Sequence, residues 1–277
     1  MDDRETTLQL ATALGVAVAA SELDPLFEIA PELIEWSINS AGDPRGALRT
    51  SAWTRDHARA AAVIARVAPE LASVRDRLVD DDDYEGLGLA SRGVGGASVR
   101  WWMLAGDGAA MAERVRAAWP EHADAIDRLL TAAGGASTCA AAGVESGAHA
   151  RQTIYARLRD PAAAIRVLEL AAVAASQPAN LFWKGICGLE PGGRDWPQVW
   201  VGHSHGSGGG WKFYYFARGD ERRWTDEVLL DAVRAAPALV RSWEVVRSVG
   251  AQPCIQLIGL TIRPSEDPAF TVYLARR

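Results

Sequence analysis

The stretch Trp211–Asp220 reads W-K-F-Y-Y-F-A-R-G-D, and the fold prediction starts from its pattern. Side chains alternate between the two faces of a β-strand, so Lys212, Tyr214 and Phe216 would share one face. The opposite face would carry bulky aromatic rings: Trp211, Phe213 and Tyr215. A strand with a cation and a tyrosine on one face and packed rings on the other predicts a wall between a polar interior and an apolar exterior.

Similar segments recur along the chain. V-R-W-W-M-L-A-G-D ends at Asp107, Q-T-I-Y-A-R-L-R-D ends at Asp160, and F-T-V-Y-L-A-R-R ends at Arg277. Their equivalent aromatic positions, spaced by 53, 59 and 59 residues, are Trp102, Tyr155, Tyr214 and Tyr273. A repeat of about this length indicates repeated supersecondary units.

Five strand pairs are predicted from alternating patterns joined by turn residues. They are Leu33–Ser40 with Ala47–Thr54, Tyr84–Ala90 with Ser98–Leu104, Ser137–Glu145 with Ala150–Leu158, Gln198–His205 with Trp211–Arg218, and Cys254–Arg263 with Pro268–Arg276. A twisted sheet of ten strands tends to curl, and closing it removes its exposed edges. The sequence therefore predicts an α+β fold: a ten-stranded antiparallel β-barrel of five ββ hairpins, surrounded by a ring of α-helices.

Helices are expected between the hairpins. They are Thr6–Ser21, Arg55–Val79 with an interruption near Pro69, the segment from Asp107 to Gly134, a helix that starts at Asp160-Pro161, and Arg222–Gly250 on either side of Pro237. Asp107 and Asp160 are placed to accept hydrogen bonds at helix N-termini. The Gly- and Pro-rich segment Ala179–Asp195 is predicted to be a loop covering one end of the barrel.

Composition limits the possible classes. With 277 residues, of which 49% are apolar, the chain can bury one large core, so a single domain over residues 1–277 is expected. The net charge of −6 comes without a basic stripe, which argues against nucleic-acid binding. Three cysteines without C-x-x-C spacing suit a reducing compartment. The N-terminus is acidic and Leu8–Ala20 is too short to span a bilayer, so we expect a cytoplasmic protein without membrane partners. A monomer is a separate expectation.

The polar positions in phase with Lys212 would line the lumen, and they combine cations with tyrosine and tryptophan. They are Glu35, Asn39, Arg49, Ser51, Arg100, Trp102, Arg151, Thr153, Tyr155, Arg157, Lys212, Tyr214, Thr271 and Tyr273. Burying several cations is costly unless an anion compensates them, and Arg and Lys pair well with phosphate. Aromatic faces attract cations. A ligand with a diphosphate at one end and a developing cation at the other is an allylic diphosphate.

With these features the chain resembles the ABBA (αββα) aromatic prenyltransferases, and it looks most similar to the cyanobactin type that modifies ribosomal peptides (RiPPs). The resemblance covers nearly the whole chain as architecture. Its motifs are the K-x-Y-like second strands, the L-I-E-W-S strand and the strand of Arg49. Thr153 and Thr271 depart from the family, which often has lysine before the tyrosine of the third hairpin; there the nearest cation in phase is Arg151.

The resemblance implies roles for the matched positions. The diphosphate would be bound by four cations: Arg49, Arg100, Arg151 and Lys212. The prenyl pocket and cation shield would be formed by Tyr155, Tyr214, Tyr273, Trp102 and Phe216. Thr153, Thr271 and His203 would add polar groups to the lumen, and Glu35 would be the catalytic residue that takes the proton of the acceptor. No side chain is expected to ligate a metal; Mg²⁺ is expected to arrive with the diphosphate.

The predicted function is transfer of a dimethylallyl (C5) or geranyl (C10) group from an allylic diphosphate to a nucleophilic side chain of a cyclic ribosomal peptide. One alternative is the same chemistry on a free small aromatic molecule or amino acid. Another is a non-catalytic barrel that binds a small anionic ligand, since a fold does not by itself give a function.

The acidic run Asp80–Asp83 admits a Mg²⁺ site as an alternative to a solvated turn, which is the expectation here. His203 and His205 lie two apart and admit a metal site, but no further ligand accompanies them in the sequence. Gly206–Gly210 lacks a following helix and the lysine of a phosphate-binding loop, so a hairpin turn is expected.

Overall fold

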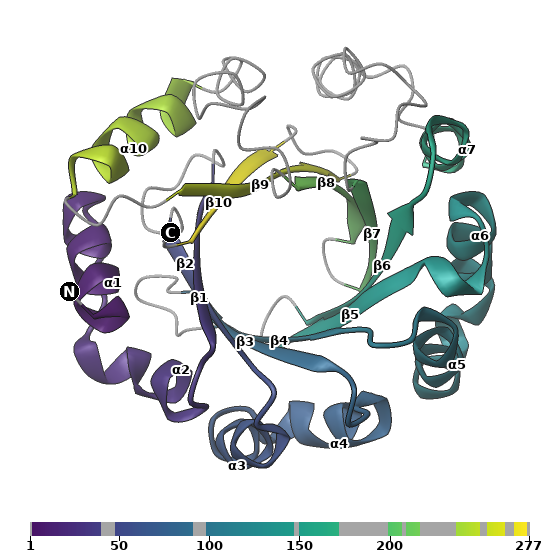
Figure 1. Cartoon of the computed structure of the whole chain (residues 1–277), viewed down its shortest axis with the longest axis horizontal. Coiled ribbons are helices and arrows are strands. Elements are labelled where there is room, and N and C mark those ends of the chain that lie inside the picture. The colour runs from purple at the N-terminus through teal and green to yellow at the C-terminus, as the bar shows by residue number, and fades with distance from the viewer. Residues whose placement is uncertain are drawn as a thin grey trace.

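A computed structural model describes residues 2–39, 48–90, 98–146, 150–171, 199–206, 209–216, 237–249, 254–263 and 269–275. Within these ranges, ten antiparallel strands close into a barrel and helices surround it (Figure 1). The order of strands around the barrel follows the chain, and β10 pairs back with β1. The predicted ten-stranded barrel is confirmed.

The strands form the five predicted hairpins. Their bounds are β1 (Leu33–Asn39), β2 (Leu48–Thr54), β3 (Tyr84–Ala90), β4 (Ser98–Leu104), β5 (Cys139–Glu145), β6 (Arg151–Leu158), β7 (Val199–Gly206), β8 (Gly210–Phe216), β9 (Cys254–Ile262) and β10 (Ala269–Ala275). The second hairpin has the bounds that the sequence predicts. Elsewhere the described ends differ by one or two residues, as where a short 3₁₀-helix, Ala136–Thr138, replaces the predicted start of β5.

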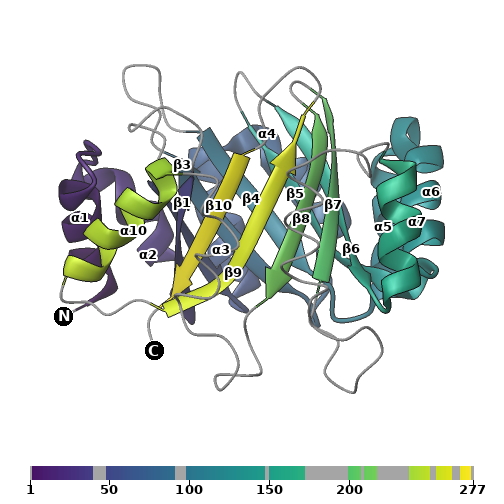
Figure 2. The same ribbon diagram turned by 90° about the horizontal axis from the view of Figure 1, so that it is seen from above.

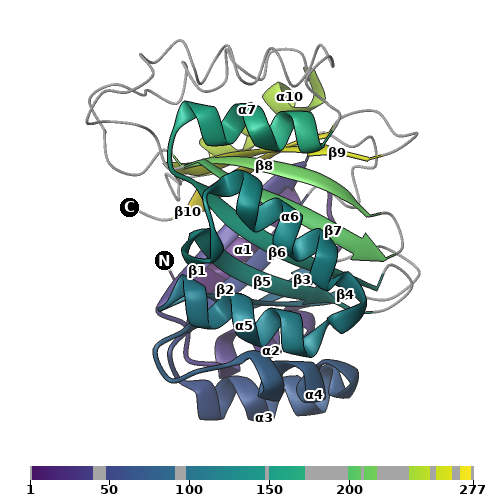
Figure 3. The same cartoon turned by 90° about the vertical axis from the view of Figure 1, so that its right-hand side faces the viewer.

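The helices lie outside the barrel. They are α1 (Asp3–Ala13), α2 (Asp24–Glu28), α3 (His57–Val67), α4 (Pro69–Leu78), α5 (Gly108–Ala118), α6 (Ala123–Ala133), α7 (Pro161–Leu170) and α10 (Pro237–Ser248). Figure 2 shows α1, α2 and α10 on one side of the strands and α5, α6 and α7 on the other. Figure 3 shows α3 and α4 on the far side of the barrel from α7 and α10. Among the described helices, none has both the length and the apolar character needed to cross a membrane.

Local sequence signals set several helix ends. Asp107 accepts hydrogen bonds from the backbone N–H groups of Ala109 and Ala110, and Asp160 accepts one from Ala163 at 2.7 Å. These are the predicted N-caps, which satisfy N–H groups that have no partner within the helix. Pro69 begins α4, so the predicted interruption of the long helix is confirmed.

The prediction of one helix over Thr6–Ser21 is wrong in its second half. α1 ends at Ala13, and Gly15 follows with φ of +68°, a conformation that interrupts the helix and that glycine adopts readily. A 3₁₀-helix, Ala20–Leu23, then leads straight into α2, whose first turn contains Pro25. The expected loop over 179–195 and the expected helix over 222–236 lie outside the described residues.

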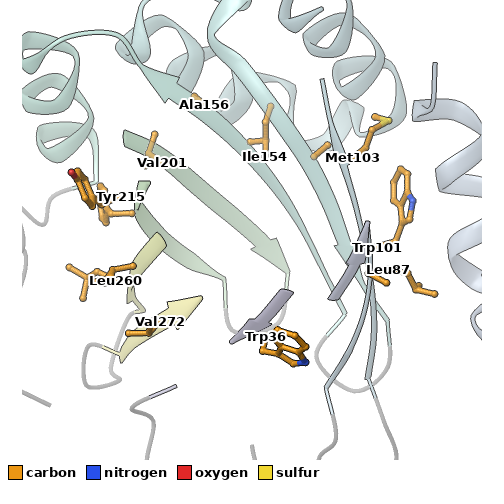
Figure 4. Packing of buried hydrophobic residues seen from close by; sticks show 14 of the residues in the cluster. Trp36, Leu87, Trp101, Met103, Ile154, Ala156, Val201, Tyr215, Leu260 and Val272 are labelled. Atoms are coloured by element: carbon orange, nitrogen blue, oxygen red, sulfur yellow. The ribbon is translucent and has the colours of Figure 1, made fainter. Parts of the chain in front are cut away.

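The hydrophobic core fills the layer between the barrel and the helices. Alternate strand residues point outward into it, as Trp36, Trp101 and Ile154 do in Figure 4, and these three are fully buried. Trp36 also donates its indole N–H to the hydroxyl of Thr7 at 2.8 Å, which joins β1 to α1. Because the outward row is largely apolar, the intervening row is left to line the lumen.

Candidate active site

Strand register decides which side chains enter the lumen, because residues directly opposite one another in an antiparallel pair point to the same face. Arg49 lies opposite Ser37, which lies opposite Tyr273, and Lys212 lies opposite Thr261. Followed around the barrel, the inward row contains most of the predicted site: Glu35, Arg49, Arg100, Trp102, Arg151, Thr153, Tyr155, Lys212, Tyr214, Thr271 and Tyr273.

Two predicted residues are not in this set. His203 pairs with Ile154 and Trp211 on the outer face, and its ring stacks on Trp211 with 4.2 Å between centroids, so its predicted place in the lumen is wrong. The inward row of β7 runs through Gly202 and Ser204 instead, and an offset of one residue reverses the face. Phe216 ends β8, but its side chain lies outside the described residues.

Charged and aromatic side chains occupy different levels of the lumen. Arg151 begins β6 at its hairpin turn, and Tyr155 lies four residues further along the same strand. Tyr214 and Tyr273 lie at the same depth in β8 and β10, whereas Lys212 is two residues nearer the turn. The four predicted diphosphate-binding cations therefore lie toward the hairpin turns, and the tyrosines form a belt in the middle of the barrel.

A buried carboxylate, Glu145, lies among the cations. Its Oε1 accepts a hydrogen bond from Arg100 Nη2 at 2.7 Å, and its Oε2 lies 2.6 Å from Arg151 Nη2. Burial would raise the pKa of Glu145, but Arg100 and Arg151 outweigh it and hold this pKa at about 2. Sequence reasoning missed Glu145 because it looked for cations and tyrosines; its alternation with Gly143 on β5 could have revealed it.

Lys212 and Arg49 are two further cations of the lumen. Burial lowers the pKa of Lys212 well below its ordinary value, and the nearby charges of Arg151 and Arg100 lower it further. Burial and the charge of Arg100 likewise lower the pKa of Arg49 to about 9. Arg263, which directly follows β9, helps to lower the pKa of Arg151 and was also missed. Mutual repulsion of desolvated cations favours a bound anion.

The tyrosine belt is a continuous row of rings. Centroids lie 5.8 Å apart for Tyr155 and Tyr214 and 5.8 Å apart for Tyr214 and Tyr273, and hydrogen bonds link Trp102, Tyr155, Tyr214 and Tyr273. Burial raises the pKa of all three tyrosines, that of Tyr273 to about 12, so the phenols are neutral at pH 7. The Lys212 ammonium lies 5.9 Å from the centroid of Tyr155, so this ring face already receives a cation.

A second aromatic cluster covers the wall formed by β2, β3 and β4. Trp53 stacks between Tyr84 and Trp102, with centroid distances of 5.8 and 6.1 Å. Sequence reasoning gave neither Trp53 nor Tyr84 a role. Glycines at the facing positions leave room for these rings, because a side chain at Gly86 would meet Trp53 within 3 Å. The wall offers a flat apolar surface to an aromatic ligand.

Glu35 enters the lumen from β1, opposite Ala275 and Ser51. Its depth is that of the tyrosine belt, four residues from the turn end of its strand, and its charge reaches Tyr273, whose pKa it helps to raise. A partly exposed carboxylate at the edge of the belt is placed to receive a proton from a bound ligand.

The acidic run Asp80–Asp83 has a structural role. Asp83 is buried, accepts backbone hydrogen bonds from Asp80 and Gly106, and pairs with Arg114 at 2.7 Å, so the expectation of a fully solvated turn is wrong for this residue. Within the described ranges, no group of three or more His, Cys, Asp or Glu side chains is placed to hold a metal ion.

Solved structures of aromatic prenyltransferases share this fold. The 5-dimethylallyltryptophan synthase of Streptomyces coelicolor superposes with a TM-score of 0.70 at 14% identity, over 98% of this chain and 95% of that one. Its complex with DMASPP and Trp gives 0.73 at 16% identity, over 98% and 93% of the two chains. The prenyltransferase PriB bound to product diphosphate gives 0.73 at 15% identity, over 99% and 95%. At such identities the similarity establishes the fold.

Sequence comparison adds nothing further: no protein-family model and no curated protein matches the chain.

Proposed function

We propose that this chain is an aromatic prenyltransferase, which transfers a dimethylallyl group from its diphosphate to an aromatic acceptor of the tryptophan class. The observation that carries the proposal is the position of Arg49 and Lys212, whose pKa values burial lowers, directly beside a belt of neutral tyrosines in one lumen. The structural neighbours support it, because one was solved with DMASPP and Trp and another with product diphosphate.

In this proposal Arg49, Arg100, Arg151 and Lys212 bind the diphosphate. Guanidinium groups pair with phosphate oxygens through two parallel hydrogen bonds, and ammonium acts as a compact charge. When the bond between C1 of the prenyl group and the bridging oxygen breaks, the diphosphate keeps the electron pair. The cations stabilise the charge that develops there, in a site where burial strengthens electrostatic interactions.

The allyl cation left behind would lie against the faces of Tyr155, Tyr214 and Tyr273. Ring quadrupoles stabilise a positive charge, and a packed belt keeps out water that would otherwise capture the cation. An electron-rich ring carbon of the acceptor then attacks it to form the new carbon–carbon bond. Glu35 takes the proton that the acceptor ring loses. The Trp53 and Tyr84 wall would hold the acceptor ring by stacking.

The finer predictions from the sequence remain proposals. A cyclic ribosomal peptide as acceptor, and geranyl diphosphate as donor, are arms of the test below, as is a barrel that binds a diphosphate without transfer. The cytoplasmic location and the monomeric state also stay predictions.

Mg²⁺ is retained in the proposal as an ion that arrives with the diphosphate. The described residues do not fit a metal held by the protein itself: Glu145 is already engaged by two arginines, and no carboxylate cluster is present among these residues. No step is therefore assigned to the metal. We expect chelation by EDTA to slow transfer without abolishing it, because the four cations can compensate the diphosphate.

The test is a mass-spectrometric assay of the purified protein with dimethylallyl or geranyl diphosphate. The acceptors are free tryptophan and tyrosine, a linear tryptophan peptide and a cyclic peptide. We expect tryptophan to gain one C5 unit. Lys212→Ala should lose this activity, whereas Arg166→Ala, which removes an exposed cation from α7, should keep it.

Each other outcome points elsewhere. Gain of mass by a peptide and not by free tryptophan would favour the peptide acceptor, and a C10 gain would assign geranyl as the donor group. Binding of both diphosphates without transfer to any acceptor would favour the alternative of a non-catalytic barrel that binds an anion. A wild-type protein that neither binds a diphosphate nor transfers a prenyl group contradicts the proposal.

A further inference from the structure

Glu145 has no task in the chemistry proposed above, although it lies within the diphosphate site. It closes β5 and is only 3% exposed. A carboxylate beside a bound anion repels it, so its presence weakens the attraction that the cations supply. Such a residue needs a compensating role.

Glu145 lies between two arginines on neighbouring strands. Arg100, Glu145 and Arg151 lie opposite one another on β4, β5 and β6, so the three side chains leave the barrel wall in one row. Each carboxylate oxygen contacts a different arginine, at 2.7 and 2.6 Å, through one terminal nitrogen of each guanidinium. Ser98 donates a further hydrogen bond to Oε1 at 3.2 Å.

This arrangement leaves most of each guanidinium available. A guanidinium carries five N–H donors, and the described contact with Glu145 uses one terminal nitrogen of each. The Nε of Arg100 is buried and has no hydrogen-bond partner within the described part of the chain. Arg100 and Arg151 are both 7% exposed, so in the absence of a carboxylate their charges would repel each other inside the protein.

We infer that Glu145 is a positioning residue, which joins Arg100 and Arg151 into one clamp that is already oriented before the diphosphate arrives. The inference rests on the proposed function, since it concerns the same anion site. Holding both guanidiniums in place reduces the ordering that binding would otherwise require. This gain offsets the repulsion between Glu145 and the ligand.

A second effect makes the role measurable. The charge of Glu145 raises the pKa of Lys212 and that of Arg49, against the lowering caused by burial and by the arginines. Replacement of Glu145 by a neutral residue should therefore make Lys212 lose its proton at lower pH. A residue that merely fills space would leave the pH dependence of anion binding unchanged.

The experiment is calorimetric titration of inorganic pyrophosphate into the protein between pH 6 and pH 9. We expect Glu145→Gln to weaken binding about tenfold, within the range for coupled neighbours. The alkaline loss of affinity should also move to lower pH. Glu145→Asp keeps the charge with a shorter reach and should be intermediate. Glu113→Gln makes the same change at an exposed position of α5 and should bind as wild type does.

A double variant separates positioning from simple charge. In an Arg151→Gln background one arm of the clamp is absent, so Glu145→Gln should cost much less than it does in the wild type. If Glu145→Gln fails to fold, Glu145→Asp alone and in the Arg151→Gln background gives the same comparison.

Pyrophosphate affinity that is unchanged or tighter in Glu145→Gln, with an unshifted alkaline limb, would overturn the inference. So would wild-type behaviour of Glu145→Asp in both backgrounds. A wild-type protein that does not bind pyrophosphate at all would instead overturn the proposed diphosphate site, and the inference with it.

Discussion

A Cβ atom on Gly143 would lie 2.4 Å from Cδ1 of the Trp102 indole, far inside van der Waals contact. The two residues face each other across β4 and β5, and the indole occupies the space above the glycine. The Trp102 ring also covers Gly88 on β3. A Cβ atom on Gly88 would lie within 2.6 Å of this ring. Glycine on both neighbouring strands therefore fixes where this indole lies.

Gly143→Ala should displace the Trp102 ring and disturb its hydrogen bond to Tyr155. We expect transfer to fall about tenfold or more, because misplaced groups in a site of this kind are costly. The transfer rate should fall by more than the loss of folded protein, which the melting temperature measures, would explain. Gly259→Ala is the graded comparison, since its nearest contact is Tyr214 at 3.1 Å. A larger loss in Gly259→Ala than in Gly143→Ala would contradict this account.

Lys212→Met should stabilise the ligand-free protein while it removes diphosphate binding. The charged form of Lys212 is disfavoured in the fold, so its pKa lies below the unfolded value. The unfolded chain then binds more protons between the lowered pKa and the ordinary value of about 10.4, and the free energy of unfolding rises with pH across this window. Thermal unfolding at several pH values measures both effects.

Lys212→Met should melt higher than wild type at pH 7, and its rise toward alkaline pH should be smaller than that of wild type, with Arg49 supplying the rest. Affinity for pyrophosphate should change in the opposite direction, falling as the wild-type Lys212 loses its proton. A variant that melts lower than wild type at pH 7 would show that the ammonium is already compensated without a ligand.

Glu85→Ala should destabilise the fold strongly. Glu85 is buried on the outer face of β3 and accepts hydrogen bonds from Arg75 at 2.6 and 2.8 Å and from the Trp101 indole at 2.8 Å, while His57 Nδ1 lies 2.5 Å away. Its loss leaves the buried Arg75 with only the exposed carboxylate of Asp76, at 3.1 Å, so we expect a cost of up to about 3–5 kcal/mol. Urea denaturation measures the change. Glu70→Ala, at an exposed position of α4, should stay within about 0.5 kcal/mol of wild type.

Acid should weaken the protein through a histidine column on its outer wall. The rings of His122, His205, His203 and Trp211 follow one another with centroid distances of 4.2, 4.3 and 4.2 Å. Burial and neighbouring histidines lower the pKa of His203 and of His205 to about 4, with Arg128 also lowering that of His203 and Glu121 opposing the shift at His205.

Because these folded-state pKa values lie below the ordinary value of about 6.5, the unfolded chain binds more protons between pH 6.5 and pH 4. Stability is complete above pH 6.5 and is lost as the pH falls toward 4. We expect the melting temperature of His203→Gln/His205→Gln to fall less than that of wild type between pH 7.5 and pH 4.5. Equal falls in the two proteins would assign the acid sensitivity to other groups.

Much of the fold could be predicted because period-two alternation repeats five times. The row Lys212 and Tyr214 faces the lumen and the row Trp211, Phe213 and Tyr215 does not, as the sequence indicates. His203 shows the limit of this reasoning. A polar residue on a strand suggests the interior, yet its neighbours Gly202 and Ser204 occupy that face and the imidazole packs among aromatic rings outside.

The charge balance of the site was harder to predict from the sequence. Alternation with Gly143 on β5 gives the face of Glu145, but it does not give its two arginines, which come from the strands on either side. The aromatic wall likewise depends on β4, whose Trp102 stacks on Trp53, which in turn stacks on Tyr84. Such relationships depend on register between strands, which alternation within one strand does not specify.

The pairing of β1 with β10 has a consequence for biosynthesis. Among the strands, β1 is synthesised first. The edge of β1 that pairs with β10 stays unpaired until β10 has been made. Tyr273, the third ring of the belt, arrives on that last strand, opposite Ser37. Until β10 is made, the sheet keeps exposed strand edges, which favour aggregation. Closure of the barrel therefore completes the tyrosine belt and removes the exposed strand edges in a single event.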